Sequence, residues 1–90
     1  MTRSTECQSV LDAEVCRWSA IPWPDLVSAL HDLLAYEIKL GSETYQVEVA
    51  LLENMENYIH VMVAVDDGKL PRSLSPLTQT FVREKHVPSA

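Results

Sequence analysis

The hydrophobic period of this chain changes once, and that change most constrains its fold. After Pro24, apolar residues recur at helical spacing: Leu26, Val27, Leu30, Leu33 and Leu34. From Tyr36 onward, apolar and polar residues alternate. A period near 3.6 is typical of an amphipathic helix and a period of two of a half-buried strand. The pattern predicts a main helix at about 24–35 packed on a three- to four-stranded antiparallel sheet, an α+β fold.

The N-terminal eighteen residues fit two conformations. Thr5 to Gln8 match a capping box, and one helical stripe is formed by Cys7, Leu11, Val15 and Trp18. These features favour a short helix near 5–17. Alternation over residues 14–18 fits an extended chain equally. Because Pro22 and Pro24 interrupt any helix arriving from this side, residues 1–18 are either a short helix or a detached segment of the single domain 1–90.

Two turns set the register of the expected sheet. Gly41-Ser42 suits a two-residue type II′ turn, which pairs Leu40 with Glu43 and places the apolar residues on one face. In the next hairpin, a four-residue loop mixes apolar and polar residues on both faces. A three-residue loop over 55–57, with Asn57 in the left-handed conformation, instead aligns two apolar rows. The first row holds Val47, Val49 and Leu51, and it faces Val65, Val63 and Val61.

The end of the chain is expected to hold one more strand. Residues 66–77 are rich in turn-forming residues and predict a long connection. A last strand is predicted over Thr78 to Lys85. Its inward face stays open, because the adjacent Phe81 and Val82 point to opposite faces of a strand. Residues 86–90 are expected to be a frayed tail.

Composition excludes several classes of function. The chain has 90 residues, of which 47% are hydrophobic, and this suffices for one modest core. Two glycines are too few for the glycine-rich loops that cradle phosphates. Thirteen acidic residues against seven basic ones give a net charge of −6, which disfavours nucleic acids and anionic membranes as partners. No apolar run reaches the length of a signal peptide or membrane span, so we expect a cytoplasmic protein with reduced cysteines.

No metal or cofactor site is predicted. The three histidines, His31, His60 and His86, fall on different predicted elements. Neither an H-x-x-x-H nor a C-x-x-C spacing occurs in the chain. Such spacings are what bring metal ligands together within one element.

The weak catalytic candidates are His60 and Glu48. A carboxylate on the same sheet face makes a histidine a candidate general base, and Tyr58 is a third polar group on that face. In the predicted register, however, His60 opposes Leu52 and Glu48 opposes Ala64. That arrangement keeps the two side chains about two residue pairs apart.

The outer sheet face is too apolar for contact with water alone. Its candidate interface residues are Ala50, Leu52, Tyr58, His60 and Met62. We therefore expect part of this face to be covered. The candidates are the N-terminal segment, a second copy of the chain, or a different protein.

The chain resembles a family of short uncharacterised bacterial proteins. The resemblance rests on Arg17-Trp18-Ser19 and on residues 45–49, 51–53, 58–61 and 65–68. It implies no activity and no site residue. In element order alone, the chain is also similar to cystatins, but it lacks their Gln-x-Val-x-Gly inhibitory hairpin, so protease inhibition is not implied.

The leading functional hypothesis is a small, non-catalytic interaction module without cofactors. It associates with itself, as a homodimer through the outer sheet face or the edge of the last strand, or with another protein. One alternative is a small enzyme or ligand-binding protein that uses His60 and Glu48. The other is an acidic, immunity-type protein that masks a basic partner through Glu37, Glu43, Glu48, Glu53, Glu56, Asp66 and Asp67.

Overall fold

A computed structural model describes residues 3–68 and 76–85 of the chain. Its helices are α1 (Arg3–Ser19) and α2 (Trp23–Ala29). Its strands are β1 (Leu34–Leu40), β2 (Glu43–Asn54), β3 (Tyr58–Asp66) and β4 (Leu77–Glu84). Most of the predicted connection at 66–77 and the whole predicted tail at 86–90 lie outside the described residues.

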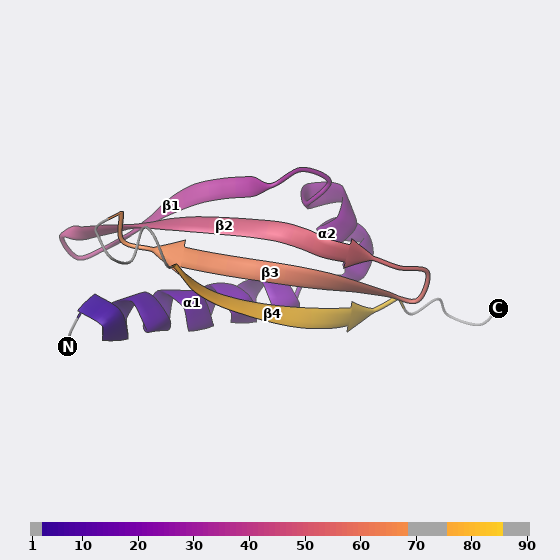
Figure 1. Cartoon of the computed structure of the whole chain (residues 1–90), viewed down its shortest axis with the longest axis horizontal. Coiled ribbons are helices and arrows are strands. Elements are labelled where there is room, and N and C mark those ends of the chain that lie inside the picture. Colours follow the sequence, from indigo (N-terminus) through magenta and orange to yellow (C-terminus); the bar gives the residue numbers. More distant parts are fainter. Residues whose placement is uncertain (1–2, 69–75, 86–90) are drawn as a thin grey trace.

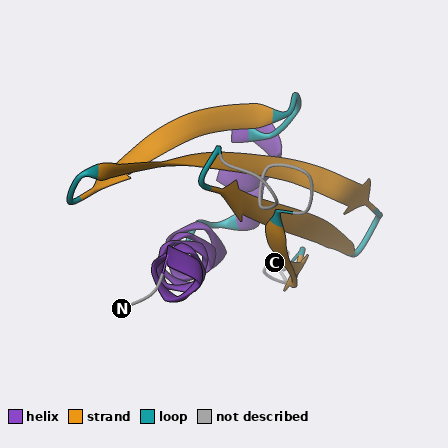
Figure 2. Ribbon diagram, turned by 60° about the vertical axis from the view of Figure 1, so that its left-hand side comes forward, coloured by secondary structure: helices purple, strands orange, loops and turns teal. Residues whose placement is uncertain are grey.

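The four strands form one antiparallel sheet in the order β1-β2-β3-β4, so β1 and β4 are its edges. Figures 1 and 2 show both helices on the same face of this sheet. The opposite face carries no element of the described chain. The α+β fold predicted from the periodicity is therefore confirmed, with two helices before the strands.

The core lies between the helices and the inner sheet face. The sheet contributes alternate residues that are fully buried: Tyr45, Val47, Val49, Ile59, Val61, Val63 and Val65. The helices contribute Cys7, Val10, Leu11, Trp18, Leu26 and Leu30. Full burial of one such aliphatic side chain stabilises the fold by about 1.5–3 kcal/mol before entropy is counted. This apolar contact holds the two layers together.

The main helix is α1, and the prediction that residues 24–35 form the main helix is wrong. α1 has 17 residues and begins before the expected capping box. The predicted stripe is correct, since Cys7, Leu11 and Trp18 are buried and Val15 packs against the core. The extended alternative for residues 14–18 is excluded. The helix is favoured over an extended chain because its continuous apolar stripe packs on the inner surface of β3 and β4.

α2 is shorter than predicted, with seven residues from Trp23 to Ala29. Leu30 is its C-cap, and the chain then turns so that Leu34 already pairs with Val49 of β2. Leu33, predicted to lie on the buried stripe, is 59% exposed. A short apolar run fits helix and strand periods equally well, and pairing with β2 decides in favour of the strand.

The first hairpin agrees with its prediction. Leu40 pairs with Glu43, Ile38 with Tyr45, and the register continues without a break to Leu34. Gly41 has φ +63° and no other residue type in the described chain has a positive φ, which is the pattern of a type II′ turn. Glycine adopts this conformation without steric cost.

The second hairpin follows the predicted register only as far as Leu51, which pairs with Val61 as expected. A bulge then shifts the pairing, so that His60 faces Glu53 and not Leu52. The expected left-handed Asn57 is also wrong, because no described non-glycine residue has a positive φ. The extra residue is accommodated in the strand as a bulge and not in the turn.

The inward face of the last strand is now settled. β4 spans Leu77–Glu84, close to the predicted Thr78 to Lys85. Phe81 packs against the core, whereas Val82 is 57% exposed. The guanidinium of Arg83 donates to the backbone carbonyl of Ser19, which ties β4 to the end of α1.

Candidate functional site

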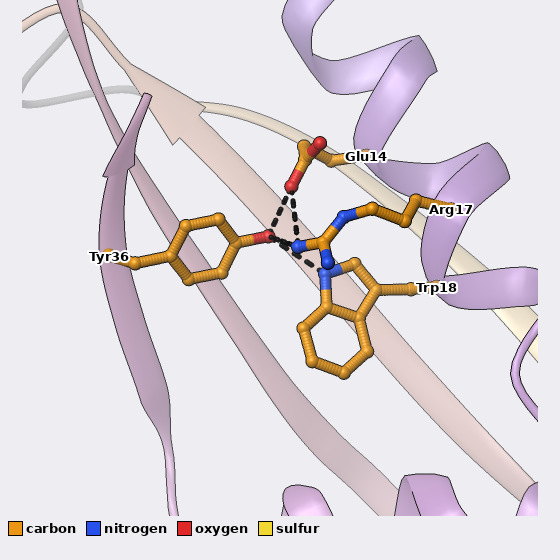
Figure 3. Close-up of polar contacts among 4 residues, drawn as sticks. All are labelled: Glu14, Arg17, Trp18 and Tyr36. Atoms are coloured by element: carbon orange, nitrogen blue, oxygen red, sulfur yellow. Dashed lines mark hydrogen bonds and ion pairs between the residues drawn. The ribbon is translucent and has the colours of Figure 1, made fainter. Parts of the chain in front are cut away.

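The most densely hydrogen-bonded polar cluster joins α1 to β1 (Figure 3). Glu14 is 7% exposed, and its Oε1 accepts hydrogen bonds from the Tyr36 hydroxyl and from Arg17 Nη2, the latter at 3.0 Å. Trp18 Nε1 donates to the Tyr36 hydroxyl oxygen at 2.8 Å, and Arg17 Nη2 approaches the same oxygen at 3.0 Å. These four residues thus satisfy one another's hydrogen-bonding groups at the boundary of the core.

Hydrogen bonding and burial raise the pKa values of two members of this cluster, Arg17 and Tyr36. A buried carboxylate is costly unless it is paired and hydrogen-bonded, and Glu14 has both a cation and a hydroxyl. The hydrogen bond to Glu14 raises the pKa of Arg17. Burial, followed by the hydrogen bond to Glu14, raises the pKa of Tyr36, so its hydroxyl stays protonated. A tyrosine held neutral is a poor base or nucleophile, so this arrangement is suited to fixing α1 on the sheet.

Stacking adds to the same attachment. The Arg17 guanidinium carbon lies 5.1 Å from the centroid of the Trp18 ring and 5.6 Å from that of Tyr36. Cation–π contacts of this kind contribute about 0.5–1 kcal/mol at exposed sites. Arg17 therefore contacts the Trp18 ring, the Tyr36 ring and the Glu14 carboxylate at once.

A second attachment of the same kind lies nearer the start of α1. The Tyr45 hydroxyl donates to Glu6 Oε1 at 2.7 Å. Burial raises the pKa of Tyr45 to about 12, and the neighbouring Glu6 carboxylate adds to the shift. Each glutamate of α1 that faces the sheet therefore accepts a tyrosine hydroxyl from β1 or β2.

Alkaline conditions should reveal the Tyr45 attachment. Its pKa is raised in the folded protein, so its contribution to stability is complete below pH 10 and is lost between pH 10 and about 12. Tyr45→Phe should lower the free energy of unfolding at pH 7 by about 1 kcal/mol through the lost hydrogen bond. Its stability should then fall less steeply than that of the wild type above pH 10. Urea denaturation followed by circular dichroism from pH 7 to 11.5 measures both effects, and parallel curves would contradict this assignment.

Between the two attachments lies a hollow that we call the α1–β1 groove. One part has a volume of about 260 Å³ and is lined by Ser9, Val10, Ala13, Glu14, Ile38 and Leu40. An adjoining part of about 260 Å³ is lined by Glu6, Ser9, Leu40 and Gly41. α1 packs over β3 and β4, so it leaves the inner side of β1 partly open. Leu40, at the end of that side, is 42% exposed.

His60 has a carboxylate neighbour, but it is not Glu48. Glu48 pairs with Ala64, whereas the bulge brings Glu53 opposite His60. His60 Nδ1 lies 3.3 Å from Glu53 Oε1. The Tyr58 hydroxyl donates a long hydrogen bond of 3.4 Å to the other oxygen, Glu53 Oε2. Glu53 is the residue that sequence reasoning missed at this place, since only the bulge turns it toward His60.

The outer sheet face divides into two halves. One half contains the outer-face patch, which we define as Ala50, Tyr58, His60, Met62 and Val82, on β2, β3 and β4. Met62 pairs with Ala50, and His60 with Val82, so these residues lie in adjacent rows of one face. Leu52 of the predicted interface lies beside it in the bulge and is 49% exposed.

The other half of the outer face is acidic. Gln46 pairs with Glu37 on β1 and with Asp66 on β3. Glu48 follows two residues along β2 on the same face. Three carboxylates therefore surround one amide side chain, within about 10 Å of one another by strand spacing.

Comparison with known proteins gives no relative. No protein-family model, curated protein or solved structure matches the chain.

The other chemistry-bearing residues lie apart from these surfaces. His31 contacts Asp32 at 3.2 Å on an exposed turn. Cys7 is buried and Cys16 is exposed, and neither forms a disulfide within the described residues. His86 lies outside the described residues. Within residues 3–68 and 76–85, no group of three metal-ligating side chains occurs and no helix is long and apolar enough to span a membrane.

Proposed function

We propose that this chain is a non-catalytic interaction module that self-associates through the outer-face patch. The observation that carries the proposal is the placement of both helices on the inner face, so that no described helix or strand covers the patch (Figure 2). Val82, in the C-terminal half of β4, is 57% exposed, and its cross-strand neighbour His60 is only partly buried. Contiguous apolar area of this kind marks contact surfaces.

The size of the patch indicates a weak contact. Tyr58 and Met62 are four residues apart, or about 13 Å along the strand, and the patch crosses three strands at spacings of about 4.8 Å. Even when the projecting side chains are counted, the area of the patch is less than the roughly 800 Å² per partner of a stable interface. The acidic half of the face resists further overlap, because two copies would bring like charges together. We therefore expect a concentration-dependent dimer with a micromolar or weaker dissociation constant.

A lysine placed in the patch should weaken this contact. Val82→Lys adds a charge that burial at the interface would leave unpaired, so the dimer should weaken by at least about tenfold. Gln46→Lys is the matched control, because it adds the same charge to the acidic half of the same face. Sedimentation velocity over a range of concentrations measures both variants, and thermal melts followed by circular dichroism verify that they fold.

The controls separate the outcomes. Weaker self-association in Val82→Lys than in the wild type, with wild-type association in Gln46→Lys, supports the outer-face patch. Equal loss in both variants would indicate a general charge effect, and a wild type that is monomeric at all concentrations would contradict self-association.

A basic partner is the second candidate. The specific observation is the grouping of Glu37, Glu48 and Asp66 around Gln46, which creates a negative region on an exposed sheet face. Opposite charge accelerates association. The His60–Glu48 enzyme gains no support from the geometry, since the two residues do not pair. We also propose a cytoplasmic location, since Cys7 and Cys16 form no disulfide with each other.

A further inference from the structure

We propose that β1 of one copy pairs antiparallel with β1 of a second copy, in the register that places Ile38 opposite Ile38. The inference rests on the proposed self-association but uses a different surface, because β1 is an edge of the sheet and the outer-face patch lies on β2, β3 and β4. It would join two four-stranded sheets into one sheet of eight strands. Three features of β1 support it.

The first feature is the open edge of β1. No described strand pairs with its outer side, and in Figure 1 that side faces away from α1, with α2 near the beginning of the strand. An edge strand presents unpaired backbone N–H and C=O groups that can pair with another strand. Backbone pairing along Tyr36 to Leu40 is therefore available to a second copy.

The second feature is apolar area beside this edge. Leu40 is 42% exposed, and with Ile38 it forms one wall of the α1–β1 groove. Residues 36, 38 and 40 alternate onto the inner side of β1. In the proposed register, Leu40 of each copy lies opposite Tyr36 of the other. Pairing would thus cover the exposed side chain of Leu40.

The third feature is the charge pattern, which selects the register. Glu37 and Lys39 are exposed on the outer side of β1 and contact no described residue through a hydrogen bond or ion pair. With Ile38 at the two-fold axis, Glu37 of each copy faces Lys39 of the other, twice per dimer. Oppositely charged cross-strand pairs stabilise a sheet and like-charged pairs destabilise it.

Neighbouring registers lack this complementarity. A shift that keeps the inner faces aligned moves the axis by whole residues. If the two-fold axis passes through Glu37 or Lys39, that residue faces the same residue of the other copy, so like charges meet. With the axis at Tyr36, Glu37 faces Ala35 and Lys39 faces Leu33. Charges on an edge strand often prevent pairing. Glu37 and Lys39 have opposite charges and are two residues apart, so here the charges favour one self-complementary register.

A charge-exchange experiment tests the register. Glu37→Lys and Lys39→Glu each turn two attractive pairs into two repulsive ones, so each should raise the dissociation constant of this contact by about tenfold or more. The double variant carrying both substitutions restores opposite charges and has the same net charge as the wild type. It should recover wild-type self-association. Sedimentation velocity is run in the wild type and in Val82→Lys, so that the edge contact is observed without the outer-face contact.

Cysteine cross-linking provides an independent measurement. In a Cys16→Ser background, Ile38→Cys places two thiols opposite each other, at a Cα separation within disulfide range. Mild oxidation should give a covalent dimer. Ala35→Cys is the control, since its two copies would lie about 20 Å apart by strand rise and should not cross-link.

The outcomes distinguish this inference from the proposed function. Weaker association in both single variants, recovery in the double variant and cross-linking at position 38 support the β1 contact. Self-association that persists unchanged in both single variants, without cross-linking at position 38, overturns the β1 contact while leaving the proposed function intact. A wild type that stays monomeric overturns both.

Discussion

Trp18→Ala should lower the free energy of unfolding by about 3–5 kcal/mol, the range found when buried aromatic residues are truncated to alanine. Trp18 is 5% exposed, and its indole also donates to the Tyr36 hydroxyl. A domain of this size has a total stability of roughly 5–13 kcal/mol. At the lower end of this range, the variant would be only marginally folded. Urea denaturation at 25 °C measures the loss.

Two further variants separate packing from hydrogen bonding. Trp18→Phe keeps most of the apolar volume and loses the N–H donor, so its cost should be smaller than that of alanine. Tyr36→Phe removes the hydroxyl shared by Glu14, Arg17 and Trp18 and should cost about 1–3 kcal/mol, because a buried carboxylate then loses a donor. A cost below about 1 kcal/mol for Trp18→Ala would show that the junction between α1 and β1 does not stabilise the fold.

Leu26→Ala should cost about 2–5 kcal/mol, the range for truncation of a buried leucine. Leu26 is completely buried and is the one fully buried residue within α2. A helix of seven residues is too short to persist in water on its own, so α2 depends on this contact. Hydrogen exchange should show loss of protection at Leu30, whose amide donates to the Leu26 carbonyl, before the sheet amides exchange.

Leu33→Ala is the matched control. Sequence periodicity places both leucines on one buried helical stripe, whereas Leu33 is 59% exposed in the structure. The substitution should change stability by no more than about 0.5 kcal/mol. Similar losses for the two leucines would indicate that the helix continues to residue 35 after all.

The second hairpin shows what sequence patterns can and cannot determine. Alternation of valines favours a three-residue loop, and this register holds from Val47 to Leu51. The register of a four-residue loop holds from Glu53 to Asn54. Both registers occur in one ladder because a bulge at Leu52 joins them. A periodicity argument assigns one register to a whole strand, so it misses the bulge and the neighbour that the bulge gives to His60.

The polar cluster of Glu14, Arg17, Trp18 and Tyr36 could not be predicted from the sequence, for a different reason. Glu14 and Tyr36 are 22 residues apart and belong to elements of different period. A glutamate on a helix ordinarily faces water. Its burial follows only from the position of α1 over the sheet. By contrast, Tyr36, Ile38 and Leu40 follow one local alternation, so their common face was predictable.

The packing of α1 against β4 sets the order in which this chain can complete its fold. The three strand pairings join neighbours in sequence and are within reach as soon as each hairpin leaves the ribosome. α1 precedes all four strands in the sequence but packs against β3 and β4. Its apolar stripe therefore lacks these partners until both strands have been synthesised. During this interval the exposed stripe of α1 is prone to aggregation and to binding by chaperones, until β4 has been synthesised and packs on it.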